Sequence, residues 1–326
     1  MLRTTILLAC LVGFSAVHGR AAESPSRAVF AYGAINAYMT STWVAREQGF
    51  FRKHSLEVEP VFIIASRAAQ AMLAGEVQVG LIGPTHVTNA VAAGGDLVMF
   101  MGNQNNVRYI VVAHPSIKRA EDLRGKRIAI CASQAGLASL ATHVALDHMG
   151  LNPRRDQITL LLIGEEPLRL VALRTGNVQA TLIAPELAAM ATSQGFVILM
   201  DMAKLNIPFQ ATGMVTTRKT LRSAPQMIER IGRASLDAIN FIRTPTNKQA
   251  VLQVMGRNLK LAKPEQLEAS YQDLVEELPH SLCPTMPGVS SIVKLMAELG
   301  INPKAGQIKT EEIVDLTLCK RLGGEG

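Results

Sequence analysis

The sequence predicts an α/β protein of two lobes, each a mostly parallel sheet flanked by helices, and two observations carry this prediction. The phrase AMLAGEVQVGLIGP, from Ala71 to Pro84, returns as ALRTGNVQATLIAP, from Ala172 to Pro185, with seven identities at an offset of 101 residues. Strand-like and helix-like segments also alternate along the chain with short loops between them, which is typical of parallel α/β sheets. A period near 100 residues is too long for a solenoid unit and favours two homologous lobes.

Each copy of the repeated phrase reads as the end of a helix closed by glycine, then a short strand, then a proline in the first turn of the next helix. The same offset aligns further residues upstream, namely Ala31 with Ala132, Ala34 with Ala135, Ala37 with Ala138, and Gly49 with Gly150. We therefore expect one register to hold from the first strand of each lobe to Pro84 and Pro185. Convergence between unrelated βαβ units is the alternative explanation of the phrase.

The first lobe is expected to begin with a strand at 27–32 and a helix at 40–48 that Gly49 stops. A strand at 56–63 follows, and Ser66 stands where an N-cap would precede a helix at 67–74. The repeat then supplies a strand at 79–82 and a helix at 84–92, before a last strand at 97–102.

The second lobe repeats this plan after a polar break at 103–106, where we expect the first crossing between lobes. Its expected strands are 109–113, 127–131, 158–163, 180–183 and 196–200, and its expected helices are 137–149, 167–174 and 185–193. The second crossing is expected near 206–213. The domain prediction is thus a signal segment at 1–21, a first lobe of 27–106 plus 214–326, and a second lobe of 107–213.

The C-terminal third does not repeat and is predicted to be mostly helical. Apolar residues from Met227 to Ile242 fall on one helical face after Pro225. Further helices are expected at 248–255, 264–278, 289–299 and 311–318. We expect this part to pack against the first lobe.

Composition places the chain among ordinary globular proteins. It has 326 residues, of which 48% are apolar and 18% charged, enough for one large or two modest cores. The formal net charge of +7 is scattered, and aromatic residues make up only 4%. A nucleic-acid surface needs clustered cations and stacking rings, so no nucleic-acid partner is expected.

The N-terminus has the form of a secretory signal peptide, which predicts export to the periplasm. Arg3 precedes an apolar run from Ile6 to Phe14, and small residues would permit cleavage after Gly19 or Ala21. A lipid anchor through Cys10 is the less favoured alternative, because the apolar run continues past this cysteine. No later segment has eighteen uninterrupted apolar residues.

Three further cysteines, Cys131, Cys283 and Cys319, give an odd count without a close pair. We therefore expect no disulfide framework. Cys131, at the end of a predicted strand, is interpreted as a small buried residue.

The chain lacks the usual motifs of catalysis and of cofactor binding. No nucleophile elbow, phosphate-binding loop, dinucleotide fingerprint or zinc motif is found, and no histidine stands at metal-ligand spacing from another ligand. Glu165 and Glu166 form the one acidic pair to be considered as an acid and a base. The alternative is a solvated turn that opens a helix at Pro167, where carboxylates suit the helix dipole.

Polar loops at the carboxyl ends of predicted strands offer a site for a small molecule. In the first lobe the candidate ligand-binding residues are Asn36, Tyr38, Ser66, Thr85 and Asn103. In the second lobe they are Ser133, Gln134, Gly136, Glu165, Pro185 and Glu186. Each could alternatively serve only as a helix cap.

Several phrases give the chain a family resemblance that covers nearly all of its mature length. They are Trp43 to Phe51, Ala71 to Pro84, Asp122 to Ile128, Ala145 to Leu151, Gly213 to Arg218 and Cys283 to Val289. In their order and spacing the chain resembles the periplasmic substrate-binding proteins of ABC transporters, in the nitrate, sulfonate, taurine and thiamine-precursor group.

The resemblance implies a two-lobed periplasmic binding protein fold of type 2 with a two-stranded hinge. It further implies that a small organic ligand, such as a sulfonate, a pyrimidine or an aromatic or carboxylic compound, is carried by a monomer to a permease in the inner membrane without cofactor or covalent step. The chain departs from the family at Ser133 to Leu137, where anion-binding members often have a Gly-Ser/Thr-rich turn. Glu186 beside the expected cleft also argues against a strongly anionic ligand, or for a ligand with a donor group.

Two other functions are compatible with this resemblance. One is a ligand sensor that signals to a membrane kinase. The other is an enzyme similar to the fungal pyrimidine synthases, although their Cys-rich motif is absent from this sequence.

Overall fold

The computed structural model describes residues 25–205, 207–261, 263–279 and 281–323. The expected signal segment, with Cys10 and both cleavage sites, lies outside the described residues. Among the residues that the structure covers, no helix has the length and apolar character needed to cross a bilayer.

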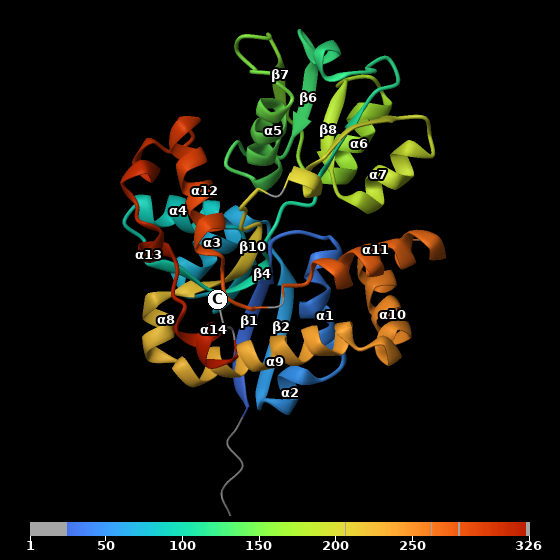
Figure 1. Ribbon diagram of the computed structural model, residues 1–326. Helices are drawn as coiled ribbons and strands as arrows, with labels where there is room; N and C mark the ends of the chain where they lie inside the picture. The colour runs from blue at the N-terminus through green and yellow to red at the C-terminus, as the bar shows by residue number, and fades with distance from the viewer. Residues whose placement is uncertain (1–24, 206, 262, 280, 324–326) are drawn as a thin grey trace, which may run out of the picture.

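Two five-stranded sheets form the two lobes, one above the other in Figure 1. In lobe 1 the strand order is β2 (Leu56–Phe62), β1 (Ser26–Tyr32), β3 (Val79–Ile82), β10 (Thr212–Thr217) and β4 (Leu97–Gln104). In lobe 2 it is β7 (Thr159–Leu162), β6 (Arg127–Ile130), β8 (Ala180–Ile183), β5 (Ile110–Ala113) and β9 (Val197–Asp201). The strands of each lobe thus occupy equivalent places in the two sheets.

Both sheets are mixed, which refines the expectation of mostly parallel sheets. Three strands of lobe 1, β2, β1 and β3, are parallel, whereas β10 is antiparallel to β3 and β4. In lobe 2, β6 is parallel to β7 and β8, whereas β5 is antiparallel to β8 and β9. The strands β10 and β5 each follow a crossing and so enter their sheets from the side of the other lobe, opposite in direction to the parallel strands.

The helices that follow the strands start and stop close to the predicted positions. Lobe 1 has α1 (Thr40–Glu47), α2 (Phe50–Lys53), α3 (Ala65–Ala74) and α4 (Pro84–Ala92), and lobe 2 has α5 (Leu137–His148), α6 (Glu166–Arg174) and α7 (Pro185–Thr192). One start was placed wrongly, because Ser66 lies inside the first turn of α3 and Ile64 occupies the N-cap. Gly49 ends α1 in the left-handed conformation with φ 75°, as expected of a glycine stop.

The register of the internal repeat holds for the repeated phrase but not for the first strand of each lobe. In the sheets Phe30 of β1 pairs with Val79, and Ile128 of β6 pairs with Ala180. The paired strands β3 and β8 are 101 residues apart, whereas Phe30 and Ile128 are only 98 apart. The first strands are therefore three positions out of the register of the repeat, and the expectation of one gapless register was wrong.

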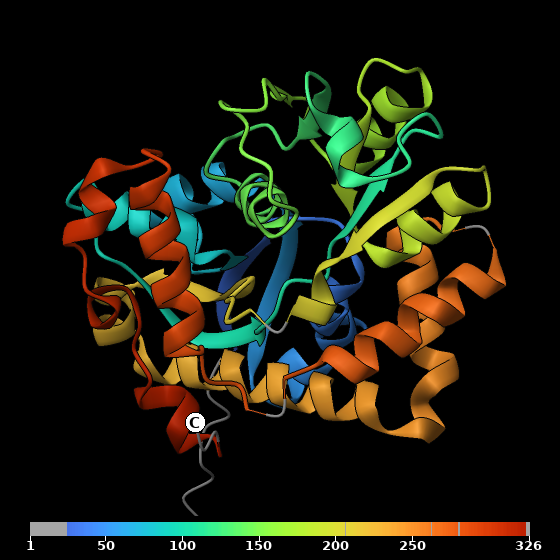
Figure 2. The same cartoon turned by 45° about the horizontal axis from the view of Figure 1, so that its top comes forward.

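The C-terminal region wraps around lobe 1 and reaches lobe 2 at two points (Figure 1, Figure 2). Its helices are α8 (Arg218–Ser223), α9 (Pro225–Arg243), α10 (Lys248–Leu259), α11 (Pro264–Glu277), α12 (Met286–Glu298), α13 (Thr310–Ile313) and α14 (Thr317–Arg321). The amphipathic α9 packs on α1 and α2, at the end of lobe 1 remote from lobe 2. On the cleft side, α11 contacts α7 and α12 contacts α5.

The single helix predicted at 311–318 is wrong, because the chain forms α13 and α14 with an extended break between them. At this break Val314 bridges to Met99 of the edge strand β4, and the Asp315 amide donates to the Met99 carbonyl oxygen at 2.9 Å. Pairing with an exposed sheet edge satisfies backbone groups and overrides the local helical pattern.

A disulfide joins Cys283 to Cys319, a single bond that the odd number of cysteines did not indicate. The two cysteines are 36 residues apart, a spacing with no signature of its own. The bond ties the segment before α12 to α14, and both lie on lobe 1. Disulfides of this kind persist in oxidising compartments.

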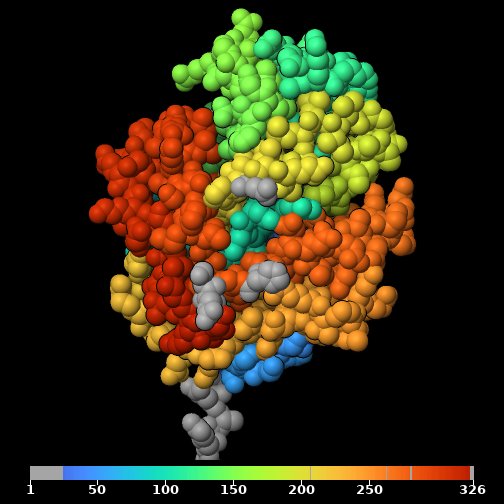
Figure 3. Space-filling model, in the orientation of Figure 1, coloured from blue at the N-terminus to red at the C-terminus, as the bar shows by residue number. Residues whose placement is uncertain are grey.

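The two crossing segments, between β4 and β5 and between β9 and β10, are held together by Gln210. This fully buried side chain donates from Nε2 to the carbonyl oxygens of Gln104 and Thr212, at 3.0 and 2.8 Å. Its Oε1 accepts from the Thr285 amide at 2.8 Å. In the space-filling view of Figure 3 the crossing segments lie between the lobes, with C-terminal residues on both sides.

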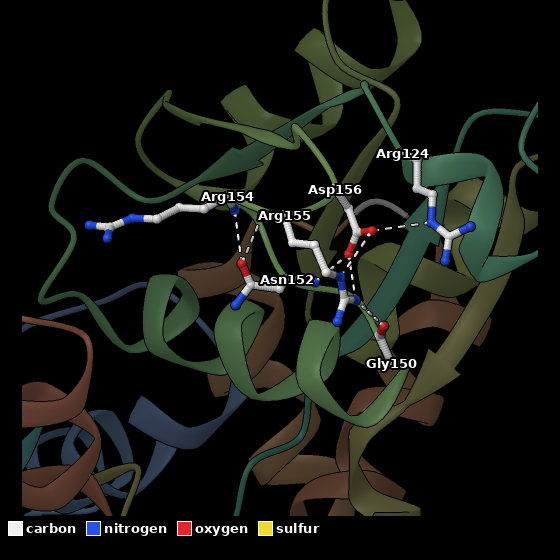
Figure 4. Close-up of polar contacts among 6 residues, drawn as sticks. All are labelled: Arg124, Gly150, Asn152, Arg154, Arg155 and Asp156. Atoms are coloured by element: carbon white, nitrogen blue, oxygen red, sulfur yellow. Dashed lines mark hydrogen bonds and ion pairs between the residues drawn. The ribbon is translucent and has the colours of Figure 1, made fainter.

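A polar cluster holds the loop between α5 and β7 at the end of lobe 2 that is remote from the cleft (Figure 4). The Asp156 carboxylate accepts from Arg155 Nη2 and from the Asn152 amide, both at 2.7 Å, and pairs with Arg124 Nε at 3.2 Å. The hydrogen bonds from Arg155 and Asn152 hold the pKa of Asp156 at about 2. The cluster fixes a turn and leaves the adjacent side chain of Arg154 extended away from it.

Candidate ligand-binding site

A cavity of about 210 Å³ lies between the lobes, at the carboxyl ends of the parallel strands. Residues of both lobes and of both crossing segments line it, among them Gly33, Thr85, Arg108, Ser133 and Ala211. An apolar cavity of about 150 Å³ holds a benzene molecule. The cavity therefore suits one six-membered ring with a small substituent, or a short chain.

Most of the residues predicted from the sequence line this cavity. They are Asn36, Tyr38, Ser66 and Thr85 of lobe 1, and Ser133, Gly136 and Glu165 of lobe 2. The prediction rested on the rule that loops at the carboxyl ends of parallel strands converge, and these loops do converge here. Their role in binding remains a prediction.

Four predicted residues lie outside the lining of the cavity. Asn103 is 1% exposed, and its Nδ2 donates to the Tyr38 carbonyl oxygen at 3.1 Å, so that it supports the wall from behind. Gln134 is exposed on the turn before α5 and is not part of the lining. Pro185 and Glu186 line a separate groove between α7 and α11.

The lobe 1 side of the cavity combines apolar side chains with uncharged polar ones. Ala34, Ile64, Ala65 and Ile82 face it, and no charged side chain of α3 or α4 joins them in the described lining. Burial lowers the pKa of His86, in the first turn of α4, to about 4, so this imidazole is neutral at pH 7.

The lobe 2 side carries charged groups at the start of α6. Glu165 is exposed, and Glu166 is half-buried with its Oε2 accepting from the Ala184 amide at 2.6 Å. Burial raises the pKa of Glu166, while the positive charge of Arg169 opposes that rise. The acidic pair is therefore split, with Glu165 in the solvated turn and Glu166 inside the cavity wall.

Arg169 is a buried charge, only 2% exposed, one turn further along α6. Its Nη1 donates to the Gly164 carbonyl oxygen at 2.6 Å and its Nη2 to that of Leu182 at 2.9 Å. Its Nε has no acceptor among the described residues. These bonds join the loop before α6 to the strand before α7 and so fix the loops that carry Glu166 and Ala184.

The turn before α5 contributes a hydroxyl and a thiol group to the lobe 2 side of the site. Ser133 Oγ accepts from the Ala135 amide at 3.2 Å, and Ser139 Oγ lies 3.0 Å from Cys131 Sγ. A Cβ atom at Gly136 would lie 2.2 Å from Cys131 Sγ, so a side chain at position 136 would displace the thiol. Cys131 was interpreted as buried but is half-buried and lines the cavity.

An ionic wall separates the cavity from the neighbouring groove. The Tyr38 hydroxyl donates to Asp273 Oδ2 at 2.9 Å, and burial together with this carboxylate raises the pKa of Tyr38. Arg108 of the first crossing segment pairs with Asp273 and, at 2.9 Å, with Glu277. The wall therefore links a crossing segment to α11 of lobe 1.

Glu186, at the start of α7, lies in the groove behind this wall. Burial raises the pKa of Glu186 to about 8, and the negative charges of Glu166 and Asp273 act in the same direction. No ion pair joins this carboxyl to a cation in the described part of the chain. Because α11 packs against α7, Glu186 lies in the groove between these two helices and not in the main cavity.

The sequence reasoning missed several residues of the lining, namely His86, Arg108, Tyr109, Glu166 and Arg169. The internal repeat contains a signal for two of them. At the 101-residue offset, Ala65 corresponds to Glu166 and Ala68 to Arg169. A charge in one copy where the twin has alanine marks a position at which the copies diverged. Arg108, by contrast, is identified only by its contact with α11.

Comparison with protein families gives one match over most of the chain. A family model described as NMT1/THI5 like matches residues 36–247. A search of the curated proteins finds no match to the sequence.

Solved structures with the same fold include transport-related binding proteins. The alkanesulfonate-binding protein SsuA from Xanthomonas axonopodis pv. citri, bound to MOPS, is 16% identical with a TM-score of 0.74, covering 91% of this chain and all of that one. The periplasmic aliphatic sulphonate binding protein SsuA from Escherichia coli is 19% identical with a TM-score of 0.71, covering 90% and 94%. The periplasmic nitrate-binding protein NrtA from Synechocystis PCC 6803 is 10% identical with a TM-score of 0.72, covering 91% and 88%. The fold is therefore that of the periplasmic binding proteins.

Proposed function

Because the chain belongs to the NMT1/THI5-like family, we propose that it is an exported solute-binding protein. In this proposal it captures a small organic molecule between its lobes and delivers it to the permease of an ABC transporter. The observation that carries the proposal is the cavity of about 210 Å³ enclosed by both lobes. Clefts at the carboxyl ends of strands in open α/β sheets are the usual place for small ligands.

Capture by this cavity requires no covalent step. A ligand that contacts both lobes stabilises the closed arrangement by the difference between its affinities for the closed and open forms. The two crossing segments are the proposed hinge, since they alone connect the sheets along the chain. Gln210 donates hydrogen bonds to both segments, and in this proposal it couples their movements when the lobes close.

The proposed location is the periplasm, with the protein acting as a monomer. The apolar N-terminal segment supports export, and the disulfide between Cys283 and Cys319 suits an oxidising compartment. The structural neighbours named above as sulfonate-binding and nitrate-binding proteins support a transport role, and lobe boundaries at 27–106 plus 214–326 and at 107–213 are part of the same proposal.

The ligand proposed is small and organic, in the range of sulfonates, pyrimidines and aromatic or carboxylic compounds. The cavity volume and the apolar side chains of Ile64, Ala65 and Ile82 on its lobe 1 side support a ring or short chain with one polar group. A highly charged solute would place its charge against Ile64, Ala65 and Ile82 without a compensating group. A large solute would exceed the volume of the cavity.

The proposal is tested by mass spectrometry of solute released from natively purified protein, together with a thermal-shift screen of small solutes. A ligand at one hundred times its Kd stabilises the folded form by about 2.7 kcal/mol, so a rise of several degrees in Tm is expected. Failure of every solute class to raise Tm, with no solute released, would contradict solute binding. Loss of uptake of the identified solute on deletion of the gene tests delivery to a permease.

A further inference from the structure

The charged groups around the cavity allow its ligand to be classified further. Positive charge in the lining comes from Arg108 and Arg169, and negative charge from Glu165 and Glu166. His86 adds no charge at pH 7, because burial lowers its pKa to about 4. The question is which of these groups remain available to a ligand.

Both arginines are already engaged within the protein. Arg108 is paired with two carboxylates, those of Asp273 and Glu277. Arg169 is 2% exposed and donates from both terminal nitrogens to backbone carbonyl oxygens. The terminal nitrogens of both guanidinium groups are thus taken by protein acceptors, while each Nε is buried without an acceptor among the described residues.

The carboxylates, in contrast, are incompletely engaged. Glu166 accepts one backbone hydrogen bond through Oε2, from Ala184, and the structure gives its Oε1 no protein donor among the described residues. Glu165 has no side-chain partner in the described part of the chain and is exposed beside it. A half-buried carboxylate with one oxygen free is an acceptor for a donor group on the ligand.

The helices that start around the cavity differ in the charge of their first turns. The first turns of α6 and α7 already contain the carboxylates of Glu166 and Glu186. The first turns of α3, α4 and α5, by contrast, contain no acidic residue. Among these helix starts, that of α6 therefore places an acidic group in the lining of the cavity.

We propose that the ligand presents a cationic or hydrogen-bond-donating nitrogen to Glu166, and that Glu166 determines this specificity. The inference rests on the proposed solute-binding function. In it the apolar part of the ligand lies against Ile64 and Ala65 of lobe 1, and the nitrogen group lies against α6 of lobe 2. The cavity then differs in charge preference from proteins that bind sulfonate or nitrate.

Three probes with one ring and different head groups test this specificity: benzamidine, benzamide and benzenesulfonate, each added at millimolar concentration. Benzamidine is expected to give the largest rise in Tm and benzenesulfonate none. Calorimetry with Glu166→Gln, which keeps an oxygen for the Ala184 amide, is expected to show benzamidine binding weakened at least tenfold. The matched control is Glu121→Gln, an exposed carboxylate before the amino end of β6, for which the affinity should change less than twofold.

The outcomes separate this inference from the proposed function. Stabilisation by benzenesulfonate and other anions alone would overturn the inference and leave solute binding intact. Benzamidine binding that is equally strong in Glu166→Gln would overturn the role of Glu166. A wider panel of cationic, neutral and anionic solutes completes the test: if no class raises Tm, solute binding itself is contradicted. If the variant fails to fold, the comparison of the three probes on the unmodified protein still tests the charge preference of the cavity.

Discussion

The two lobes have the same strand order but differ in the contacts that stabilise them and in the side chains that line the cavity. Their five-stranded sheets have equivalent strand orders. Lobe 1 is stabilised by the C-terminal helices and the disulfide, and its side of the cavity has apolar and uncharged polar side chains. Lobe 2 has no disulfide among its described residues and instead carries a buried arginine and the carboxylates of α6.

Equivalent positions in the repeat show how the difference arose on one scaffold. Ala68 is fully buried in α3, and Arg169, its counterpart in α6, is 2% exposed. An alanine is buried there without polar partners, whereas an arginine must find acceptors, which the Gly164 and Leu182 carbonyl oxygens provide. A duplicated scaffold can thus keep its core and change the chemistry at its strand ends.

Removal of the disulfide is expected to have the largest effect on stability, and this effect should be confined to lobe 1. The double change Cys283→Ser with Cys319→Ser should lower the free energy of unfolding by about 3–4 kcal/mol, since the bond closes a long loop. The single tryptophan, Trp43, is buried in lobe 1 and reports its unfolding by fluorescence in a denaturant titration. Cys131→Ser, outside the disulfide, is the control. An unchanged midpoint for the double variant would contradict the bracing role.

The counterpart in lobe 2 is Arg169→Met. The change should lower the free energy of unfolding of lobe 2 by about 2–4 kcal/mol, because two buried carbonyl oxygens lose their donors. Hydrogen exchange of β7 and β8 amides measures the effect in lobe 2, and Trp43 fluorescence shows whether lobe 1 is spared. Arg154→Met is the matched control, since this exposed side chain extends away from its neighbours (Figure 4). Equal effects of the two changes would contradict a bracing role for Arg169.

The contact between the lobes is expected to respond to pH through Glu186. Its pKa is raised from 4.5 to about 8, so the folded protein keeps a proton that the unfolded chain loses as pH rises from 4.5. The contribution of Glu186 therefore favours the folded state most below pH 4.5 and declines as pH rises toward 8. Glu186→Gln should flatten this dependence and raise stability at pH 8 by about 1–3 kcal/mol. Parallel curves of Tm against pH for the two proteins would contradict the assignment.

The smallest effect is expected from hydroxyl groups on the two sides of the cavity. Ser133→Ala removes an acceptor from the turn of lobe 2 and should weaken binding of the natively released solute about three- to tenfold. Thr85→Val, at the start of α4 in lobe 1, should change the affinity less, because the Thr85 side chain is only 1% exposed. Calorimetry with both variants checks the order, and a larger loss for Thr85→Val would reverse the assignment of polar recognition to lobe 2.

Several features were determined by the sequence alone. The repeated phrase, its glycine and proline boundaries, and the apolar periods predicted two lobes, and they predicted β3, α4 and β8 with their observed bounds. The polar loops at strand ends predicted the cavity lining at Asn36, Ser133 and Glu165. These features depend on local backbone preferences and on the geometry of parallel strands, which neighbouring residues encode.

Other features were decided only by tertiary contacts. Cys283 meets Cys319, Tyr38 meets Asp273 across 235 residues, and α11 diverts Glu186 from the main cavity. The change of register at β6 likewise appears only in the strand pairing. Such contacts depend on how distant elements pack, and a single sequence carries no local pattern that specifies which buried groups will share a partner.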